Sequence, residues 1–280
     1  MSAVPGRTNS GNLLVLLALA AGAVAAPLPA FAGAAWDEIK ASVYGTRAIH
    51  DGRGLITLRA PGRPEDQKAV PVGITAGFAD GRSVRTLTLI VDENPSPVAA
   101  VFRFGEGRDR VSLGTNLRLN AQTDVRVVVE ADDGQLYMVE QLVKFAGGQG
   151  ACAAPPTGDP AEVLASMGKV KLAELPDTGP NAGKASSVNR RVKLDIRHPN
   201  YTGMQMDQIT LLFVPLRIVN RLEVKQGSET VFAMDGSITL SEDPTLEFDY
   251  KSNGAGALQV TVKDTSGAEW DKTIPVGPSS

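Results

Sequence analysis

Short runs of apolar residues, separated by turn residues, fill the chain between Gly54 and Phe145. The runs are rich in Val, Leu, Ile, Thr and Phe, and their spacing is typical of a β-sandwich. An Asp132-Asp133-Gly134 turn separates the last two runs, since glycine accepts the positive φ of a tight hairpin. The pattern predicts seven strands, at 55–60, 70–78, 84–91, 98–104, 111–119, 125–131 and 136–145.

The same pattern returns from Arg191 onward. Pro215 lies inside one of its apolar runs and indicates an edge strand or a bulge, because proline cannot donate to a strand ladder. The predicted strands of this region are 192–196, 209–213, 216–225, 230–234, 237–240, 246–250, 258–263 and 270–276. The chain is therefore expected to be all-β, with one sandwich domain at 33–146 and a second at 189–280.

Residues 147–188, between the two regions, are dense in Gly, Pro, Ala, Ser and Asn, and we interpret them as a linker. Asp159 as N-cap, Pro160 and Glu162 in the first turn predict one short helix within this linker. Gly168 weakens the helix, and Pro176 ends it at the latest.

The first residues have the parts of a signal peptide, and we expect residues 1–32 to be one. Arg7 precedes an apolar run at 13–26, and Ala30-Phe31-Ala32 is a small-residue cleavage site. The run is short for a bilayer, so a mature chain that begins near Gly33 and has no membrane anchor is expected. An uncleaved anchor is the alternative.

Charge and residue inventory exclude several functions. The chain has 28 Lys and Arg against 31 Asp and Glu, without a basic cluster, which argues against nucleic-acid binding. Its only histidines, His50 and His198, together with one cysteine, cannot form a structural zinc site, and no metal or cofactor is expected. His50, which precedes Asp51-Gly52, is expected to be a loop residue, and His198, at a strand end, is expected to be a structural or surface residue. Met204 and Met206 are expected to pack, with a copper site as the alternative.

The single cysteine, Cys152, lies in a Gly- and Ala-rich stretch, residues 147–156, which we call the arm. Exported proteins normally pair their cysteines, so a lone one indicates an external partner or a free thiol with a chemical role. We expect Cys152 to be exposed and mobile, and to be a covalent attachment point on a flexible arm that contains Gly147, Gly148 and Gly150. No basic residue beside it in the sequence lowers its pKa, so activation would come from a partner.

Two alternatives remain for Cys152. It is either an unpaired surface cysteine without a role, or the nucleophile of a hydrolase that pairs it with His198. The second needs the two side chains within hydrogen-bond distance of each other.

Two motifs resemble those of known families. Asp92-Glu93-Asn94-Pro95-Ser96-Pro97, followed by Phe102, resembles the Asp-x-Asn-Pro-x-Pro…Phe signature of SoxY, the sulfur-carrying subunit of bacterial thiosulfate oxidation. His198-Pro199-Asn200-Tyr201-Thr202-Gly203 resembles the His-Pro-Met-Glu-Thr-Gly of SoxZ. Val214-Pro215, Ser241-Glu242-Asp243-Pro244 and Phe248 follow in SoxZ order. The chain thus resembles a fused SoxY–SoxZ carrier.

The resemblance implies two immunoglobulin-like β-sandwiches in a periplasmic protein that is not an enzyme. Cys152 would hold a sulfur intermediate covalently and present it to periplasmic sulfur-oxidising enzymes, and the two halves would pair within one chain as SoxY and SoxZ do. Unlike the terminal arm of SoxY, this arm is internal, in Gly-Gly-Gln-Gly-Ala-Cys-Ala-Ala-Pro. The leader lacks the twin arginines of SoxY, which indicates Sec-type export.

Fused chains of this kind resemble the quinoprotein-dehydrogenase-associated SoxYZ-like carriers, which makes periplasmic quinoprotein redox enzymes the other expected partners. The alternative function is an accessory module that docks on such a dehydrogenase, with Cys152 incidental. Nothing in the sequence identifies the cargo.

Overall fold

The structure is a computed structural model that describes residues 1–3, 32–145, 147–176 and 189–277. The chain separates into two compact units, Met1–Phe31 and Ala32–Ser280. The predicted signal peptide, 1–32, falls almost wholly outside the described residues. Within the described ranges, no helix is both long enough and apolar enough to span a membrane.

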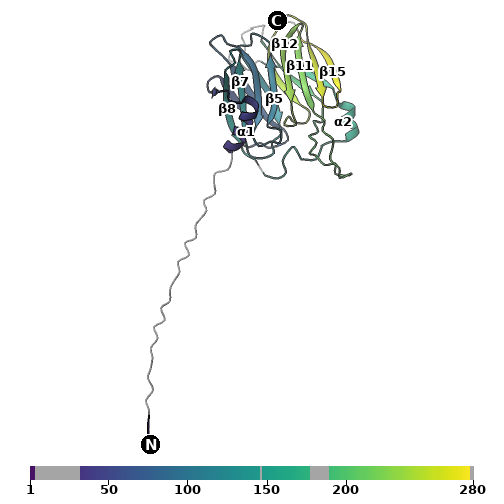
Figure 1. Ribbon diagram of the computed structural model, residues 1–280. Coiled ribbons are helices and arrows are strands. Elements are labelled where there is room, and N and C mark those ends of the chain that lie inside the picture. Colours follow the sequence, from purple (N-terminus) through teal and green to yellow (C-terminus); the bar gives the residue numbers. More distant parts are fainter. Residues whose placement is uncertain (4–31, 146, 177–188, 278–280) are drawn as a thin grey trace. The chain divides into compact units, whose positions relative to one another are not determined.

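The unit Ala32–Ser280 is built almost entirely of strands (Figure 1). Its first half forms α1 (Ala32–Tyr44), β1 (Ile49–Asp51), β2 (Ile56–Arg59), β3 (Val70–Gly77), β4 (Val84–Val91), β5 (Val98–Phe104), β6 (Arg110–Leu117), β7 (Thr123–Ala131) and β8 (Leu136–Val143). Its second half forms α2 (Pro160–Ser166), β9 (Val170–Leu175), β10 (Asn189–Ile196), β11 (Val219–Gln226), β12 (Glu229–Gly236), β13 (Thr245–Lys251), β14 (Ala257–Asp264) and β15 (Glu269–Pro275).

Both sheets contain strands from both halves of the chain. The larger sheet has the order β1-β8-β7-β4-β5-β12-β11-β14-β15, and the smaller has the order β2-β3-β6-β13-β10-β9. The halves meet where β12 pairs antiparallel with β5, and where β13 pairs antiparallel with β6. Figure 1 labels β7, β5, β12, β11 and β15, which follow one another across the larger sheet in this order, with β5, β12 and β11 as direct neighbours. The two halves are therefore joined by backbone hydrogen bonds as well as by the chain between them.

A single apolar core lies between the sheets and includes side chains of both halves. Phe102 of β5 lies edge-on to Phe232 of β12 at 5.8 Å, and Phe232 contacts Phe248 of β13 at 5.0 Å between ring centroids. All three rings are about 1% exposed. Because alternate residues of a strand point to opposite faces, this core follows directly from the apolar alternation in the sequence.

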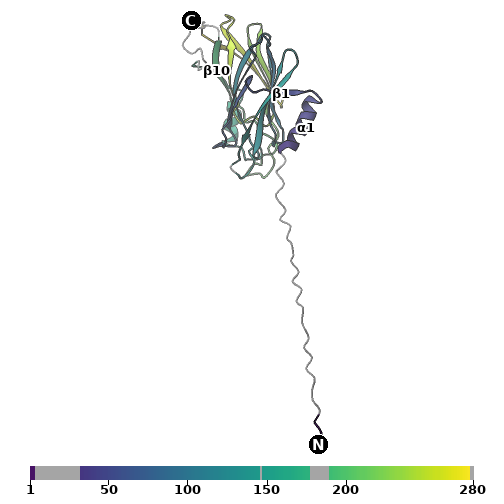
Figure 2. The ribbon, with the colours of Figure 1, turned by 90° about the vertical axis from the view of Figure 1, so that its left-hand side faces the viewer.

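The helix α1 covers the outer face of the larger sheet near β1 (Figure 2). Trp36 and Ile39 of α1 pack on Ile90 and Val128, which point away from the main core. This second, smaller cluster explains why β4 and β7 are buried on both faces. The sequence pattern did not predict α1, because its apolar positions follow directly on the predicted leader.

The expected all-β fold class with two sandwich-type halves is confirmed. All seven strands predicted for the first half are present within a few residues, and α2 begins after its predicted N-cap, Asp159, which accepts from the amides of Ala161 and Glu162. His50 lies in β1 and not in a loop as predicted.

Three details of the predicted organisation are wrong. Residues 209–213 and 237–240 form no strand, although both contain β-branched and apolar residues, and the predicted linker contributes strand β9. The last error arises because Val170 and Leu172 alternate with polar residues and pack against the core.

The shared core predicts one cooperative unfolding transition. Replacing Phe232 with Ala is expected to lower the free energy of unfolding by about 3–5 kcal/mol, because it leaves a cavity where both halves meet. Trp36 and Trp270 are the only tryptophans, one in each half, so Trp36→Phe and Trp270→Phe each leave a single probe. Urea unfolding should give the same midpoint for both probes, and Phe232→Ala should lower both equally. Two distinct midpoints would show that the halves unfold independently.

Candidate functional site

Cys152 lies in a turn, and its side chain is completely buried. The prediction of an exposed, mobile thiol is therefore wrong for this structure. Gly147 and Gly148 are exposed, with φ of 96° and 91°, whereas Gly150 packs so closely that a Cβ there would lie 2.7 Å from Asn120 Oδ1. Glycine in the arm thus permits turns and close approach to the body of the protein.

The first half of the chain holds the arm by its backbone amides. The amide of Cys152 donates to Asn120 Oδ1 at 2.9 Å, and the amide of Ala151 donates to the carbonyl oxygen of Leu119 at 3.1 Å. The backbone amide of Asn120 in turn donates to Asn94 Oδ1 at 3.0 Å. The arm is therefore attached to the segment that follows β6.

Asn94 belongs to the motif of the first half and connects the two halves beneath the arm. It is 5% exposed, and its Nδ2 donates to the carbonyl oxygen of Arg118 at 2.7 Å and to Thr239 Oγ1 at 3.2 Å. Both polar atoms of this buried amide are satisfied, as burial requires. Asn94 thereby fixes the position of Asn120, and Asn120 fixes that of Cys152.

The second half holds the arm by its carbonyl oxygens. Thr202 Oγ1 donates to the carbonyl oxygen of Cys152 at 2.5 Å, and Gln205 Nε2 donates to that of Ala154 at 3.0 Å. Gln205 Oε1 accepts from the amide of Thr202 at 3.1 Å, which orients both side chains. We call Asn120, Thr202 and Gln205 the clamp; all three bind backbone atoms of the arm and leave the thiol itself unbound.

Asp92, the first residue of the same motif, has a structural role. Arg126 Nε donates to both oxygens of Asp92 at 3.0 and 2.8 Å, and its guanidinium lies 4.7 Å from the ring of Trp36. Burial raises the pKa of Asp92, while Arg126 opposes that shift. This buried pair connects α1 to the sheet.

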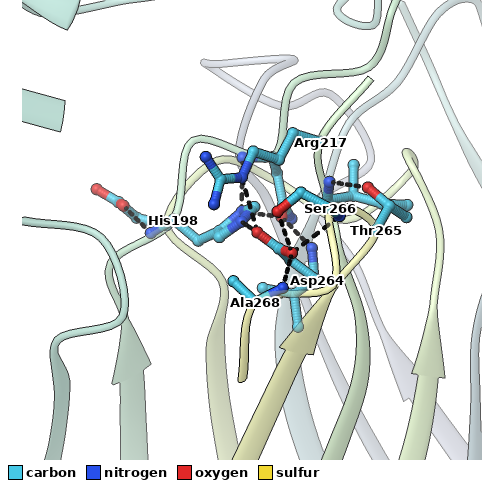
Figure 3. A network of polar contacts seen from close by, with 10 residues as sticks. His198, Arg217, Asp264, Thr265, Ser266 and Ala268 are labelled. Atoms are coloured by element: carbon cyan, nitrogen blue, oxygen red, sulfur yellow. Dashed lines mark hydrogen bonds and ion pairs between the residues drawn. The ribbon is translucent and has the colours of Figure 1, made fainter. Parts of the chain in front are cut away.

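His198 begins the motif of the second half and is completely buried in a polar network (Figure 3). Its Nδ1 lies 2.9 Å from Asn200 Oδ1 and its Nε2 lies 3.4 Å from Asp264 Oδ2. Arg217 Nε donates to the same Asp264 oxygen at 2.7 Å. Although burial opposes ionisation, donation from Ser266 and Arg217 lowers the pKa of Asp264 to about 2. The network anchors the segment that carries Thr202.

Burial lowers the pKa of His198, so the imidazole is neutral at pH 7. Both ring nitrogens face Asn200 and Asp264, and no hydrogen bond to Cys152 is found among the described residues. The structure therefore does not bring together the Cys–His pair that a hydrolase needs, and it confirms His198 as a structural residue.

The loop at 201–217 joins the clamp to an exposed apolar surface. Isolated bridges pair Tyr201 with Arg217 and Met206 with Phe213. Its tip displays large apolar side chains that are 50% or more exposed, namely Ile209, Leu211, Leu212, Phe213 and Leu216. The apolar run at 209–213 therefore lies at an exposed loop tip and does not form the core strand that its composition predicts. Met204 and Met206 are also partly exposed, at 37% each, contrary to the expectation that they pack.

The environment of the thiol keeps it protonated. Burial raises the pKa of Cys152 to about 11, and the charge of Arg118 opposes the shift. Sequence reasoning missed Arg118, which lies 34 positions before the cysteine and is brought beside the arm only by the fold. In the described part of the chain, no group of three or more His, Cys, Asp or Glu could hold a metal ion.

Comparisons with known proteins agree with this geometry. Residues 40–152 match the family model of the sulfur oxidation protein SoxY, and residues 180–275 match that of the sulphur oxidation protein SoxZ. The fold and the matches define a two-part carrier of the sulfur-oxidation class. The chain belongs to the SoxY and SoxZ families as a fusion of both in one polypeptide.

Two solved structures show weaker likeness. The sulfur carrier protein SoxY from Chlorobium limicola f thiosulfatophilum is 25% identical, with a TM-score of 0.33, and the match covers 41% of this chain and 94% of that one. A superoxide reductase (neelaredoxin) from Ignicoccus hospitalis is 14% identical, with a TM-score of 0.27, and the match covers 39% and 90%. No curated protein matches the chain.

The raised thiol pKa predicts an unusual pH dependence of labelling by iodoacetamide. Because burial favours the protonated thiol, the closed arm loses stability relative to the open arm as the pH rises above the ordinary thiol pKa of about 8.5. The labelling rate of the native protein should therefore rise about tenfold per pH unit from pH 7 to 10, and level off only near the pKa of about 11. In 8 M urea the rate should level off near about pH 8.5. A native profile that levels off there as well would contradict a buried thiol.

Proposed function

We propose that the chain is an exported, periplasmic and non-catalytic carrier that holds a sulfur-containing intermediate covalently on Cys152. Partner enzymes of sulfur oxidation would load and process that intermediate. One observation carries the proposal: the chain's one cysteine is the last residue of the SoxY match, and its backbone is held by side chains of both halves, Asn120 and Thr202.

The buried thiol requires the carrier to alternate between a closed and an open arm. The arm is attached through backbone atoms, by the clamp and by the bond between Ala151 and Leu119. Each such bond contributes a net ~1 kcal/mol, so opening costs about 4 kcal/mol, and roughly one molecule in a thousand is open. Such a fraction keeps the thiol protected between encounters with partner enzymes and still leaves an open form that they can load.

An open arm has a limited reach. Cys152 lies five residues from Gly147 and five from Thr157, whose hydroxyl bonds Glu242 at 2.9 Å. Five extended residues span at most about 17 Å, so the thiol can move by roughly that distance from the body. A partner with a shallow active site, or one that contacts the body beside the arm, fits this reach better than a partner with a deep channel.

Weakening the clamp should expose the thiol without unfolding the protein. Thr202→Val removes the donor to the carbonyl oxygen of Cys152 and should speed iodoacetamide labelling about five- to tenfold at pH 8. Thr210→Val is the matched control, because the Thr210 hydroxyl bonds Asp207 within the same loop and not the arm. Labelling that proceeds only at the rate of global unfolding, in wild type and variant alike, would exclude a carrier whose arm opens locally.

The cargo itself is tested by mass. The mature protein, purified from its native source without reductant, should show a mass increase that disappears on reduction and is missing in Cys152→Ser. Cys152→Ser should also abolish, in cells, the oxidation of sulfur compounds that depends on this carrier, because no other thiol is present in the chain. A thiol that is always unmodified, together with a fully functional Cys152→Ser strain, would refute the proposal.

A second candidate function is favoured by the exposed apolar tip of the 201–217 loop, which is typical of a protein-docking surface. In this alternative the chain is an accessory module that docks on a periplasmic quinoprotein dehydrogenase, and Cys152 is incidental. Affinity capture distinguishes the carrier from the docking module. If the chain is a docking module, Cys152→Ser should retain the captured partners and the activity in cells, whereas Phe213→Ser should lose both.

A further inference from the structure

The tip of the 201–217 loop displays a group of large apolar side chains at the surface. Five residues there are at least 50% exposed: Ile209, Leu211, Leu212, Phe213 and Leu216. Outside this loop, the large apolar residues that are exposed in the described ranges are far apart in the sequence: Met1, Val43, Leu142 and Leu164. Single exposed apolar residues are normal on a protein surface, whereas a contiguous group marks an interaction site.

Leu211 in this tip has a backbone conformation that favours glycine or asparagine. Its φ is 58°, in the left-handed region, where the Cβ of a leucine crowds the following carbonyl oxygen. The amide of Leu211 donates to the carbonyl oxygen of Asp207 at 2.9 Å, which holds the residue in this turn. The residue is 67% exposed, so burial in the core does not compensate for the strain. A strained residue that displays its apolar side chain to solvent indicates a function outside the fold.

The tip is joined to the clamp by hydrogen bonds between the two sides of the loop. The amide of Val214 donates to the carbonyl oxygen of Gln205 at 2.8 Å, and the next pair toward the tip is Phe213 with Met206. Gln205 Nε2 donates in turn to the carbonyl oxygen of Ala154 in the arm at 3.0 Å. The apolar tip therefore ends one residue pair from a side chain that holds the arm.

We propose that the tip is the docking surface for the enzyme that acts on Cys152, and that it inserts into a neutral, apolar groove beside that enzyme's active site. The proposal rests on the carrier function. Because the open arm reaches at most about 17 Å, a partner must contact the body of the protein near the clamp. An enzyme that binds Phe213 contacts the loop next to Gln205 and meets this requirement.

The charge and the size of the tip define the partner. Residues 202–216 contain no Lys or Arg, and Oδ1 of Asp207, their one charged residue, accepts from the amides of Ile209 and Thr210. A surface without basic residues lacks the attraction to anionic lipids that holds peripheral proteins on membranes. Five side chains are also far fewer than the roughly 20–30 residues per side of a stable interface, so the tip fits a transient partner protein.

The grooves found in the described ranges are charged, so a second copy of this chain fits the tip poorly. The 960 Å³ groove on the smaller sheet is lined by Arg59, Lys193 and Glu247 among others. The 380 Å³ pocket beside α2 includes Glu162 and Glu242. Apolar side chains inserted there would remove these charges from water without supplying a partner for them.

A photocrosslinker at the tip identifies the occupant. In the native periplasm, the chain with p-benzoylphenylalanine in place of Phe213 should crosslink to an enzyme of sulfur oxidation, identified by mass spectrometry. The same group in place of Leu142 is the matched control, because Leu142 is 47% exposed but lies in β8, and it should not crosslink to that enzyme. Crosslinks to a second copy of the chain, to lipid alone or to no protein would overturn the proposal.

The purified enzyme then allows the contact to be measured by isothermal titration calorimetry. Leu211→Asn and Phe213→Ser should each weaken binding at least about tenfold, whereas Leu142→Ser should leave it unchanged. Because the groove is neutral, raising NaCl from about 50 to about 500 mM should change the Kd less than about twofold. A Kd that Leu211→Asn leaves unchanged, or one that rises steeply with salt, would overturn the proposal.

Leu211→Asn also separates docking from folding. Since asparagine tolerates the left-handed conformation, the equilibrium constant for unfolding in urea should be the same as in wild type or about two- to fivefold more favourable to the folded state. The variant should react with iodoacetamide at the wild-type rate, because a small reagent needs no docking. A clearly less stable Leu211→Asn would show that the side chain serves the fold, and the docking role would be wrong.

Failure of the carrier function gives a different result from failure of docking. If Cys152 is always unmodified while the tip still binds the enzyme, the carrier function is wrong and the docking surface remains. If Cys152 carries cargo while Leu211→Asn binds the enzyme as wild type does, only the docking proposal is wrong.

Discussion

The antiparallel pairing of β5 with β12 joins the two halves of the chain into one sheet, and the position of the cysteine depends on that pairing. The pairing of β6 with β13 does the same for the second sheet, and the rings of Phe102, Phe232 and Phe248 fill the space between them. Because the sheets are continuous, Asn120 from the first half and Thr202 from the second reach the same turn of the arm. A fusion in a single chain also fixes the ratio of the halves and raises their effective concentration for each other.

The clamp binds backbone atoms of the arm, so the hydrogen bonds that hold the arm do not involve the sulfur atom. A clamp on the sulfur would change whenever the cysteine gained or lost a load, whereas amides and carbonyls stay the same. The closed arm shields the thiol and raises its pKa to about 11, which suppresses oxidation because the thiolate is the reactive form. In the proposed carrier, opening of the arm would restore an ordinary thiol, so the exposure and the reactivity of Cys152 would change together.

Each of the two family motifs contains one residue that anchors its own segment and another that helps to hold the arm. Asp92 and His198 are buried in charged or polar networks that hold α1 and the start of the 201–217 loop. Asn94 and Thr202 connect those supports to the arm, Asn94 through Asn120 and Thr202 directly. The spacing within each motif therefore has a physical reason: one residue anchors the segment, and another, two to four positions later, holds the arm, either directly or through Asn120.

The sequence alone determined most of the strands, because a period of two in apolar residues fixes which face of a strand is buried. It also determined α2, because Asp159 and Pro160 act locally. The motifs were also readable, since they are contiguous. Only the tertiary structure decided that Cys152 is covered, that the segment after Arg118 binds the arm, and that the apolar residues at 209–213 face solvent. Burial depends on which distant surfaces meet. A stretch of Gly and Ala carries no local signal of the clamp that closes over it, because the side chains of that clamp come from positions 32 and more residues away.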